Sequence, residues 1–146
     1  MKCSEKAVEL FLEGYNCSQA VFGAFSEELG LSRDMALKLA APFGGGIGRL
    51  RSVCGACSGM LMVLGVKEGY PTPETGAVKA AHYEVVRSLC GEFEKQNGSI
   101  ICREILKDTD LSGPPAERTE QYYKERPCVR CVRTASEIIE KYLEGK

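Results

Sequence analysis

Helical periodicity runs along almost the whole chain and limits the fold more than any other feature of the sequence. After Asn16, a typical N-cap residue, apolar side chains recur at the spacing of one helix face, and Gly30 then ends the pattern. The positions on that face are Cys17, Ala20, Val21, Ala24, Phe25 and Leu29. No segment shows the alternation of apolar and polar residues that is typical of strands. The pattern therefore predicts an all-α protein.

Caps, glycines and prolines delimit the other predicted helices. We expect these helices over residues 4–13, 33–41, 52–66, 74–95, 99–106 and 128–143. Residues 52–66 are apolar all round, which places that helix at the centre of the bundle. Residues 112–127 are rich in proline and charge and are predicted to form a solvated connection with one helical turn near Tyr122. With 146 residues, the chain is predicted to be one domain, 1–146, a bundle of about six to seven helices.

The predicted helix 74–95 has one apolar face, which we expect to be buried. On the helix 74–95, the expected buried stripe consists of Val78, Ala81, Val85, Val86, Leu89 and Phe93. His82 lies within this stripe, and we expect a core residue there more often than a metal ligand.

The glycine-rich segment 44–48 lacks the Lys-Ser/Thr of a phosphate-binding loop. We interpret it as a flexible connection that lets the backbone approach a site.

Charge and hydropathy exclude several classes of protein. The chain has 19 Lys and Arg against 20 Asp and Glu, and this balance argues against a nucleic-acid-binding protein. The longest apolar stretch, residues 59–66, is far too short to span a bilayer, so no membrane insertion is expected. Residues 1–13 carry three glutamates and do not resemble a secretory signal. We therefore expect a cytoplasmic protein, and a homodimer is plausible for a small helical domain with a buried cofactor.

Cysteine is the unusual component of the composition. The chain has eight cysteines, and in a cytosolic protein such clusters indicate metal or redox chemistry more often than permanent disulfides. Two CxxC pairs, Cys54–Cys57 and Cys128–Cys131, each open a predicted helix. Because residues three apart share a helix face, each pair can direct two sulfurs to one point. Four thiolates would suffice for Zn²⁺ or for an iron–sulfur cluster.

Four cysteines fall in the first turn of predicted helices: Cys17, Cys54, Cys102 and Cys128. Free backbone N–H groups and the positive end of the helix dipole favour a thiolate at such positions. If these helix starts converge, they would form a pocket for an anionic cofactor or for reactive thiols. The alternative is that the four are small buried hydrophobic residues.

The remaining candidates have weaker support. Arg49 and Arg51 precede the first CxxC pair and are either solvated charges or a positive field that stabilises thiolates. Cys90 is expected in the core of its helix, and Cys3, near the terminus, is expected to be incidental.

The cysteines stand in segments that resemble the C-GCAxxG-C-C family, which is described as redox-active largely on account of its cysteines. The matching segments, in order, are GYNCSQAV at 14–21, FGGGIGR at 43–49, CGACSG at 54–59, CREIL at 102–106 and CVRCVRTA at 128–135. The resemblance implies a single helical domain with four characteristic cysteines. On this chain they are Cys17, Cys54, Cys102 and Cys128.

A similar module occurs in split-Soret cytochromes, where it is associated with an iron–sulfur centre and with haem. Neither CxxC pair here is followed by histidine, because Ser58 and Val132 take that position. Covalent c-type haem is therefore not expected.

Three functional hypotheses follow, and the sequence leaves open whether the chain is an enzyme. The preferred one is an iron–sulfur cluster, [2Fe-2S] being possible, held by Cys17, Cys54, Cys102 and Cys128 for electron transfer with an unidentified redox partner. The second is cofactor-free thiol–disulfide exchange by Cys54, Cys57, Cys128 and Cys131. The third is structural zinc held by four cysteines.

Overall fold

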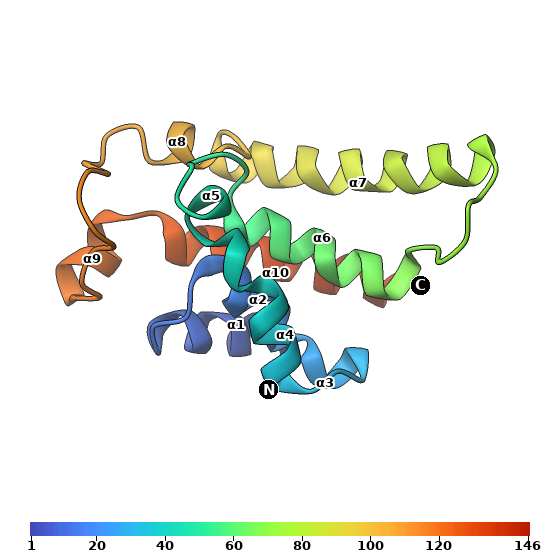
Figure 1. Ribbon diagram of the computed structural model, residues 1–146, viewed down its shortest axis with the longest axis horizontal. Coiled ribbons are helices and arrows are strands. Elements are labelled where there is room, and N and C mark those ends of the chain that lie inside the picture. Colours follow the sequence, from blue (N-terminus) through green and yellow to red (C-terminus); the bar gives the residue numbers. More distant parts are fainter.

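The computed structural model describes residues 1–146 and confirms an all-α fold (Figure 1). The helices of eight or more residues are α1 (Cys3–Leu12), α2 (Cys17–Ala24), α4 (Arg33–Ala40), α6 (Gly55–Glu68), α7 (Gly76–Asn97) and α10 (Cys128–Glu144). Short turns connect them: α3 (Ser26–Leu29), the 3₁₀ turn η1 (Ala41–Phe43), α5 (Gly44–Ile47), α8 (Cys102–Ile105) and α9 (Glu120–Glu125). No strand is present, and Val53 and Ile101 form a single isolated bridge.

Asn16 caps α2 as predicted, and Ser32 caps the helix expected from residue 33, whereas Ser99 does not cap α8, whose N-cap is Ile101. The Gln19 N–H donates to Asn16 Oδ1 at 2.9 Å, and the Met35 N–H donates to Ser32 Oγ at 3.1 Å. The expected single helix over 17–29 is instead broken at Phe25, whose backbone (φ −96°, ψ 0°) ends α2 before α3 begins. Phe25 is 1 % exposed, so the break coincides with the anchoring of a large side chain in the core.

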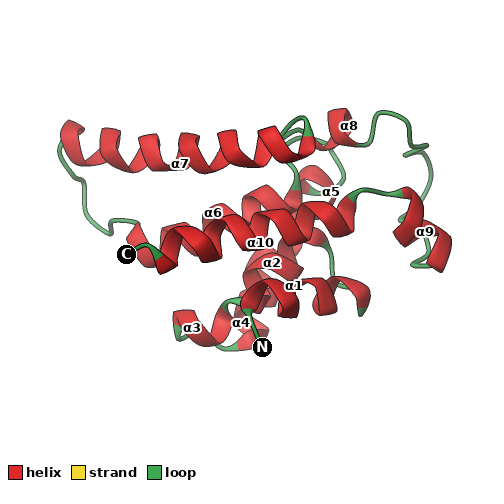
Figure 2. Ribbon diagram, turned by 180° about the vertical axis from the view of Figure 1, so that it is seen from behind, coloured by secondary structure: helices red, strands yellow, loops and turns green.

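The centre of the bundle is α6, as predicted from its apolar composition. Met60, Val63 and Leu64 are fully buried, and α6 contacts both α2 and α10. Helix α1 packs against α2 and α10 on the other side of these two helices (Figure 2). The outer end of α6 leaves the core, where Val66 is 48 % exposed.

Two glycines set the close approach of α2 and α6. A Cβ on Gly55 would lie 3.1 Å from the Ser18 nitrogen and 3.3 Å from the Cys17 Cβ. A Cβ on Gly59, one turn later, would lie 3.0 Å from both the Ser18 carbonyl oxygen and the Val21 Cβ. Any larger side chain would push the helices apart, so the glycines hold the start of α2 against the start of α6.

The expected buried stripe on α7 is confirmed in the C-terminal half of the helix and is wrong at Val78 and Ala81, which are exposed. Only Leu89, Phe93 and Asn97 are buried, whereas Val78 is 42 % exposed. Figures 1 and 2 show α7 as the outermost long helix of the bundle. His82 is half-buried, and its ring lies 5.6 Å from that of Tyr70, so it does not reach the core. The periodicity identified the correct face, but the bundle covers only the second half of the helix, from Val85 onward.

None of the helices combines the length and the apolar character that crossing a membrane requires.

Substitutions at two glycines of α6 test the helix packing. We expect Gly59→Val to lower the free energy of unfolding by about 1–3 kcal/mol, because the new methyl groups would overlap α2. Gly65→Val is the matched control, since nothing lies within 4 Å of its ideal Cβ, and a change within about 0.5 kcal/mol is expected. Urea denaturation measures both. Equal effects of the two substitutions would contradict the assigned role of Gly59.

Candidate functional site

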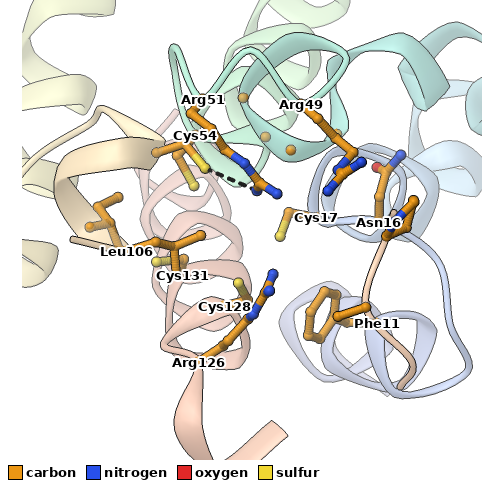
Figure 3. Close-up of a pocket in the computed structure, with 18 of the residues that line it drawn as sticks. Phe11, Asn16, Cys17, Arg49, Arg51, Cys54, Leu106, Arg126, Cys128 and Cys131 are labelled. Carbon is orange, nitrogen blue, oxygen red and sulfur yellow. Dashed lines mark hydrogen bonds between the residues drawn. The ribbon is translucent and has the colours of Figure 1, made fainter. Parts of the chain in front are cut away.

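One cavity of about 380 Å³ gathers five of the eight cysteines (Figure 3). The cysteines that line it are Cys17, Cys54, Cys102, Cys128 and Cys131. They come from the beginnings of α2, α6, α8 and α10, so the predicted convergence of these helix starts is observed. Cys17, Cys102 and Cys128 are the first residues of their helices, and Cys54 is the N-cap of α6.

Backbone pairing places Cys54 beside Cys102. The Cys54 N–H donates to the Ile100 carbonyl at 2.7 Å, and the Cys102 N–H donates to the Ser52 carbonyl at 2.6 Å. These bonds flank the Val53–Ile101 bridge and join two segments that are almost fifty residues apart in the chain. The pairing therefore fixes two sulfurs that the sequence could not show to be neighbours.

The segment expected to be a flexible glycine connection is instead a tight left-handed turn. All five residues of 45–49 have positive φ, and Arg51 follows with φ 60°. A Cβ on Gly46 would lie 2.7 Å from the Arg51 Cα and from the Ser52 nitrogen, so only glycine fits there. The left-handed backbone is costly at Arg49 and Arg51, and such strain is typical of functional sites.

Four arginines surround the cysteines: Arg49, Arg51, Arg118 and Arg126 all line the cavity. Arg51 Nη1 donates to the Cys102 sulfur at 3.7 Å. The side chains of Arg51 and Arg126 approach the cavity from opposite sides (Figure 3). This arrangement supports the interpretation of Arg51 as part of a positive field around the cysteines, whereas Arg49 is exposed and donates through Nη2 to the Gly113 carbonyl at 2.7 Å.

Arg118 and Arg126 were missed because they lie in the segment predicted to be a solvated connection. Arg118 donates to the Phe11 and Tyr15 carbonyls, each at 2.9 Å, and its guanidinium lies 4.3 Å from the centre of the Phe11 ring. Nothing in the sequence signals this anchoring. Arg126 stands two residues before Cys128, and that proximity was the only available signal.

Cys17 and Cys128 form a thiol pair in the cavity. A hydrogen bond from Cys17 lowers the pKa of Cys128 to about 7, with further help from Arg126, Arg118 and Arg51. The same hydrogen bond and burial raise the pKa of Cys17 well above its ordinary value. At neutral pH this pair therefore consists of a proton donor, Cys17, and a partly ionised acceptor, Cys128.

Cys54 and Cys131 form the second pair. The hydrogen bond from Cys131 lowers the pKa of Cys54, and the N–H groups of Ala56 and Cys57 at the start of α6 add to this effect. The pKa of Cys131 is raised by the same contact and by burial. Cys102 belongs to neither pair, and burial raises the pKa of its thiol although Arg51 opposes the shift.

Asn97, the last residue of α7, contacts Cys131 of the Cys54–Cys131 pair. Its side-chain oxygen lies 3.6 Å from the Cys131 sulfur and accepts a hydrogen bond from Arg130 Nε at 3.1 Å. Its amide donates to Thr134 Oγ1 at 2.9 Å. The buried end of α7 thereby contacts the cysteine site.

Of the two CxxC pairs, only Cys128 and Cys131 direct both sulfurs into the cavity, and there each contacts a different partner, Cys17 or Cys54. Cys57 does not line the cavity, and its sulfur lies 3.8 Å from that of Cys90. The reason is that Cys54 is an N-cap residue with non-helical backbone (φ −53°, ψ 132°), so it lies outside the helical register of Cys57.

Two further cysteines lie outside the cavity and contribute to packing. Cys90 is half-buried on α7 and packs against the core, as expected. Cys3 is only 5 % exposed, and burial raises the pKa of its thiol to about 11, so it is a packed residue of α1 and not part of a loose terminus.

The eight cysteines are all free thiols. No three His, Cys, Asp or Glu side chains converge closely enough to form a ready site for a single metal ion.

The family model described as putative redox-active protein (C_GCAxxG_C_C) matches residues 15–142 of the chain. The chain therefore belongs to this family, and the resemblance noted in the sequence is confirmed. Searches of curated proteins and of solved structures gave no match.

The pKa of Cys128 provides a test of the first pair in reduced, metal-free protein. Its alkylation by iodoacetamide should rise with pH around a midpoint near 7, since only the thiolate reacts. We expect Cys17→Ala to move this midpoint up by about one to two pH units, because a hydrogen bond to a charged group contributes about 1.5–3 kcal/mol.

The measurement is residue-resolved mass spectrometry after timed labelling between pH 5.5 and 9.5. Cys57→Ala is the matched control, because Cys57 lies outside the cavity and should leave the Cys128 midpoint in place. An unchanged midpoint in Cys17→Ala would show that the two sulfurs do not interact.

Proposed function

We propose that this redox-family protein transfers electrons through an iron–sulfur cluster held by Cys17, Cys54, Cys102 and Cys128. The observation that carries the proposal is the convergence of four helix-start cysteines and four arginines on one cavity. Thiolates are the usual ligands of such clusters, and four are required for a [2Fe-2S] centre. When bound, the cluster would supply reversible one-electron chemistry to an external redox partner.

The charge distribution fits such a group. A cluster with four thiolate ligands is an anion, and a buried anion needs compensation. The arginines and the N-termini of α2, α6 and α10 direct positive charge towards the cavity. The chain's own residues thereby bind and electrostatically stabilise an anionic centre.

Structural zinc is a third candidate for the same cavity. Zn²⁺ requires its ligands to converge on one point, and no such convergence is present in the structure. A cluster of several irons is wider than one ion, so its ligands can lie around the cavity wall. Structural zinc therefore ranks below the cluster as a proposal.

A second candidate function is thiol–disulfide exchange, which is favoured by the two thiol pairs. The Cys54 thiolate would attack a substrate disulfide, forming a mixed disulfide and releasing one thiolate. Cys131 would then displace the second substrate sulfur, whose departing thiolate takes the Cys131 proton. The chain would end with a Cys54–Cys131 disulfide and the substrate as two thiols. Cys128 with Cys17 could act in the same way.

Two variants separate these functions because each removes a cysteine that only one of them needs. Cys102→Ser should abolish cluster binding but leave both thiol pairs able to form disulfides. Cys131→Ser should retain the cluster but prevent the Cys54–Cys131 disulfide. Cys57→Ser is the control for both, since Cys57 does not line the cavity.

The measurement is anaerobic purification with iron, sulfide and zinc analysis and a visible spectrum. We expect about two irons and two sulfides per chain for a [2Fe-2S] centre, with charge-transfer absorption that Cys102→Ser eliminates. A colourless, iron-free protein with disulfides at the thiol pairs would support exchange chemistry instead. One zinc per chain without a redox response would indicate a structural metal.

A further inference from the structure

A second dithiol lies outside the cavity, on the other side of α6. The sulfurs of Cys57 in α6 and Cys90 in α7 are 3.8 Å apart. Neither residue lines the cavity, and neither is among the four characteristic cysteines of the family. This pair therefore has no role in either function proposed above.

The two thiols are chemically unequal. Cys57 is fully buried, whereas Cys90 is half-buried and reachable from the surface of α7. A hydrogen bond from Cys57 lowers the pKa of Cys90 to about 7, and the same contact together with burial raises that of Cys57. Cys90 thus has the properties of an attacking thiolate, and Cys57 those of a protected resolving thiol.

Cys90 also lies on a helix of which only one half packs against the core. Leu89, Phe93 and Asn97 are the only buried residues of α7, so Cys90 lies in the part of the helix that meets the core. A covalent bond needs the two sulfurs about 2.05 Å apart. The helix can supply this movement because only its C-terminal half packs against the core and its N-terminal half is exposed.

We propose that Cys57 and Cys90 form a second redox site, which reacts with small-molecule disulfides and links α6 to α7 by an intramolecular disulfide. The Cys90 thiolate attacks one sulfur of the small disulfide, giving a mixed disulfide and releasing a thiolate. Cys57 then attacks the Cys90 sulfur and displaces the second thiolate, which takes the Cys57 proton. Two protein thiols are oxidised, and one small disulfide is reduced to two thiols.

The disulfide would fasten α7 to the bundle next to the cavity. Asn97 lies two turns after Cys90 on the same helix face and contacts Cys131. Oxidation of the second site thus holds the helix that supports the first. The inference does not depend on which cofactor or chemistry the cavity uses.

The test incubates the full-length reduced protein with glutathione disulfide, blocks free thiols in acid and maps tryptic peptides by mass spectrometry. In the unsubstituted protein we expect a disulfide joining peptide 52–67 to peptide 88–95. In Cys57→Ser, Cys90 should instead retain a glutathione adduct. In Cys90→Ser, Cys57 should remain a free thiol because it is buried.

Two controls make the assignment specific. Cys54 shares a tryptic peptide with Cys57, so Cys54→Ser must keep the linked peptide if the bond involves Cys57. Cys3→Ser, which alters a distant buried thiol, should change nothing. A persistent glutathione adduct on Cys90 in the unsubstituted protein, or two free thiols there, would overturn the proposal.

Hydrogen exchange gives an independent measurement. Amides of residues 76–90 should exchange more slowly in the disulfide form than in the reduced form, since the linked helix opens less often. The Cys90→Ser variant should show no such difference after the same treatment. Equal exchange in both forms of the unsubstituted protein would contradict a link that fixes α7.

Discussion

The close packing of α2 against α6 is the constraint on which the rest of the structure depends. Gly55 and Gly59 remove the side chains that would separate the helices, and the start of α2 can then lie beside the start of α6. Cys17 and Cys54 reach the same cavity as a result, and the Val53–Ile101 bridge adds Cys102. The cysteine site is therefore a consequence of helix packing, with each thiol placed at a helix N-terminus where ionisation is favoured.

Electrostatics then determine what this cavity can hold. The left-handed turn over residues 45–49 has an unfavourable backbone conformation and places Arg49 and Arg51 at the cavity wall. The segment before α10 contributes Arg118 and Arg126. In each thiol pair one sulfur keeps its proton and the other has a lowered pKa. The cavity thus combines ready thiolates with nearby positive charge, which suits both an anionic cluster and a nucleophilic thiol.

Helix α6 separates two cysteine sites of different character. Its N-cap, Cys54, belongs to the cavity, whereas Cys57 in its first turn faces α7 and Cys90. The first site is lined by arginines, and the second is a pair of thiols at the part of α7 that meets the core. Asn97 connects them physically, because it ends α7 and contacts Cys131. Redox chemistry at the second site would act on the support of the first.

Sequence alone determined the local structure of this protein. Periodicity, Asn16, Ser32 and Gly30 marked helices and their ends, and helix starts identified four of the five cavity cysteines as a group, because capping and dipole effects are local. Tertiary structure alone decided which sulfurs meet. Three features depend on the relative positions of distant segments: the contact of Cys57 with Cys90, the exposure of α7, and the presence of Arg118 and Arg126 at the cavity. No spacing along the chain encodes those positions, since they result from packing of the whole bundle.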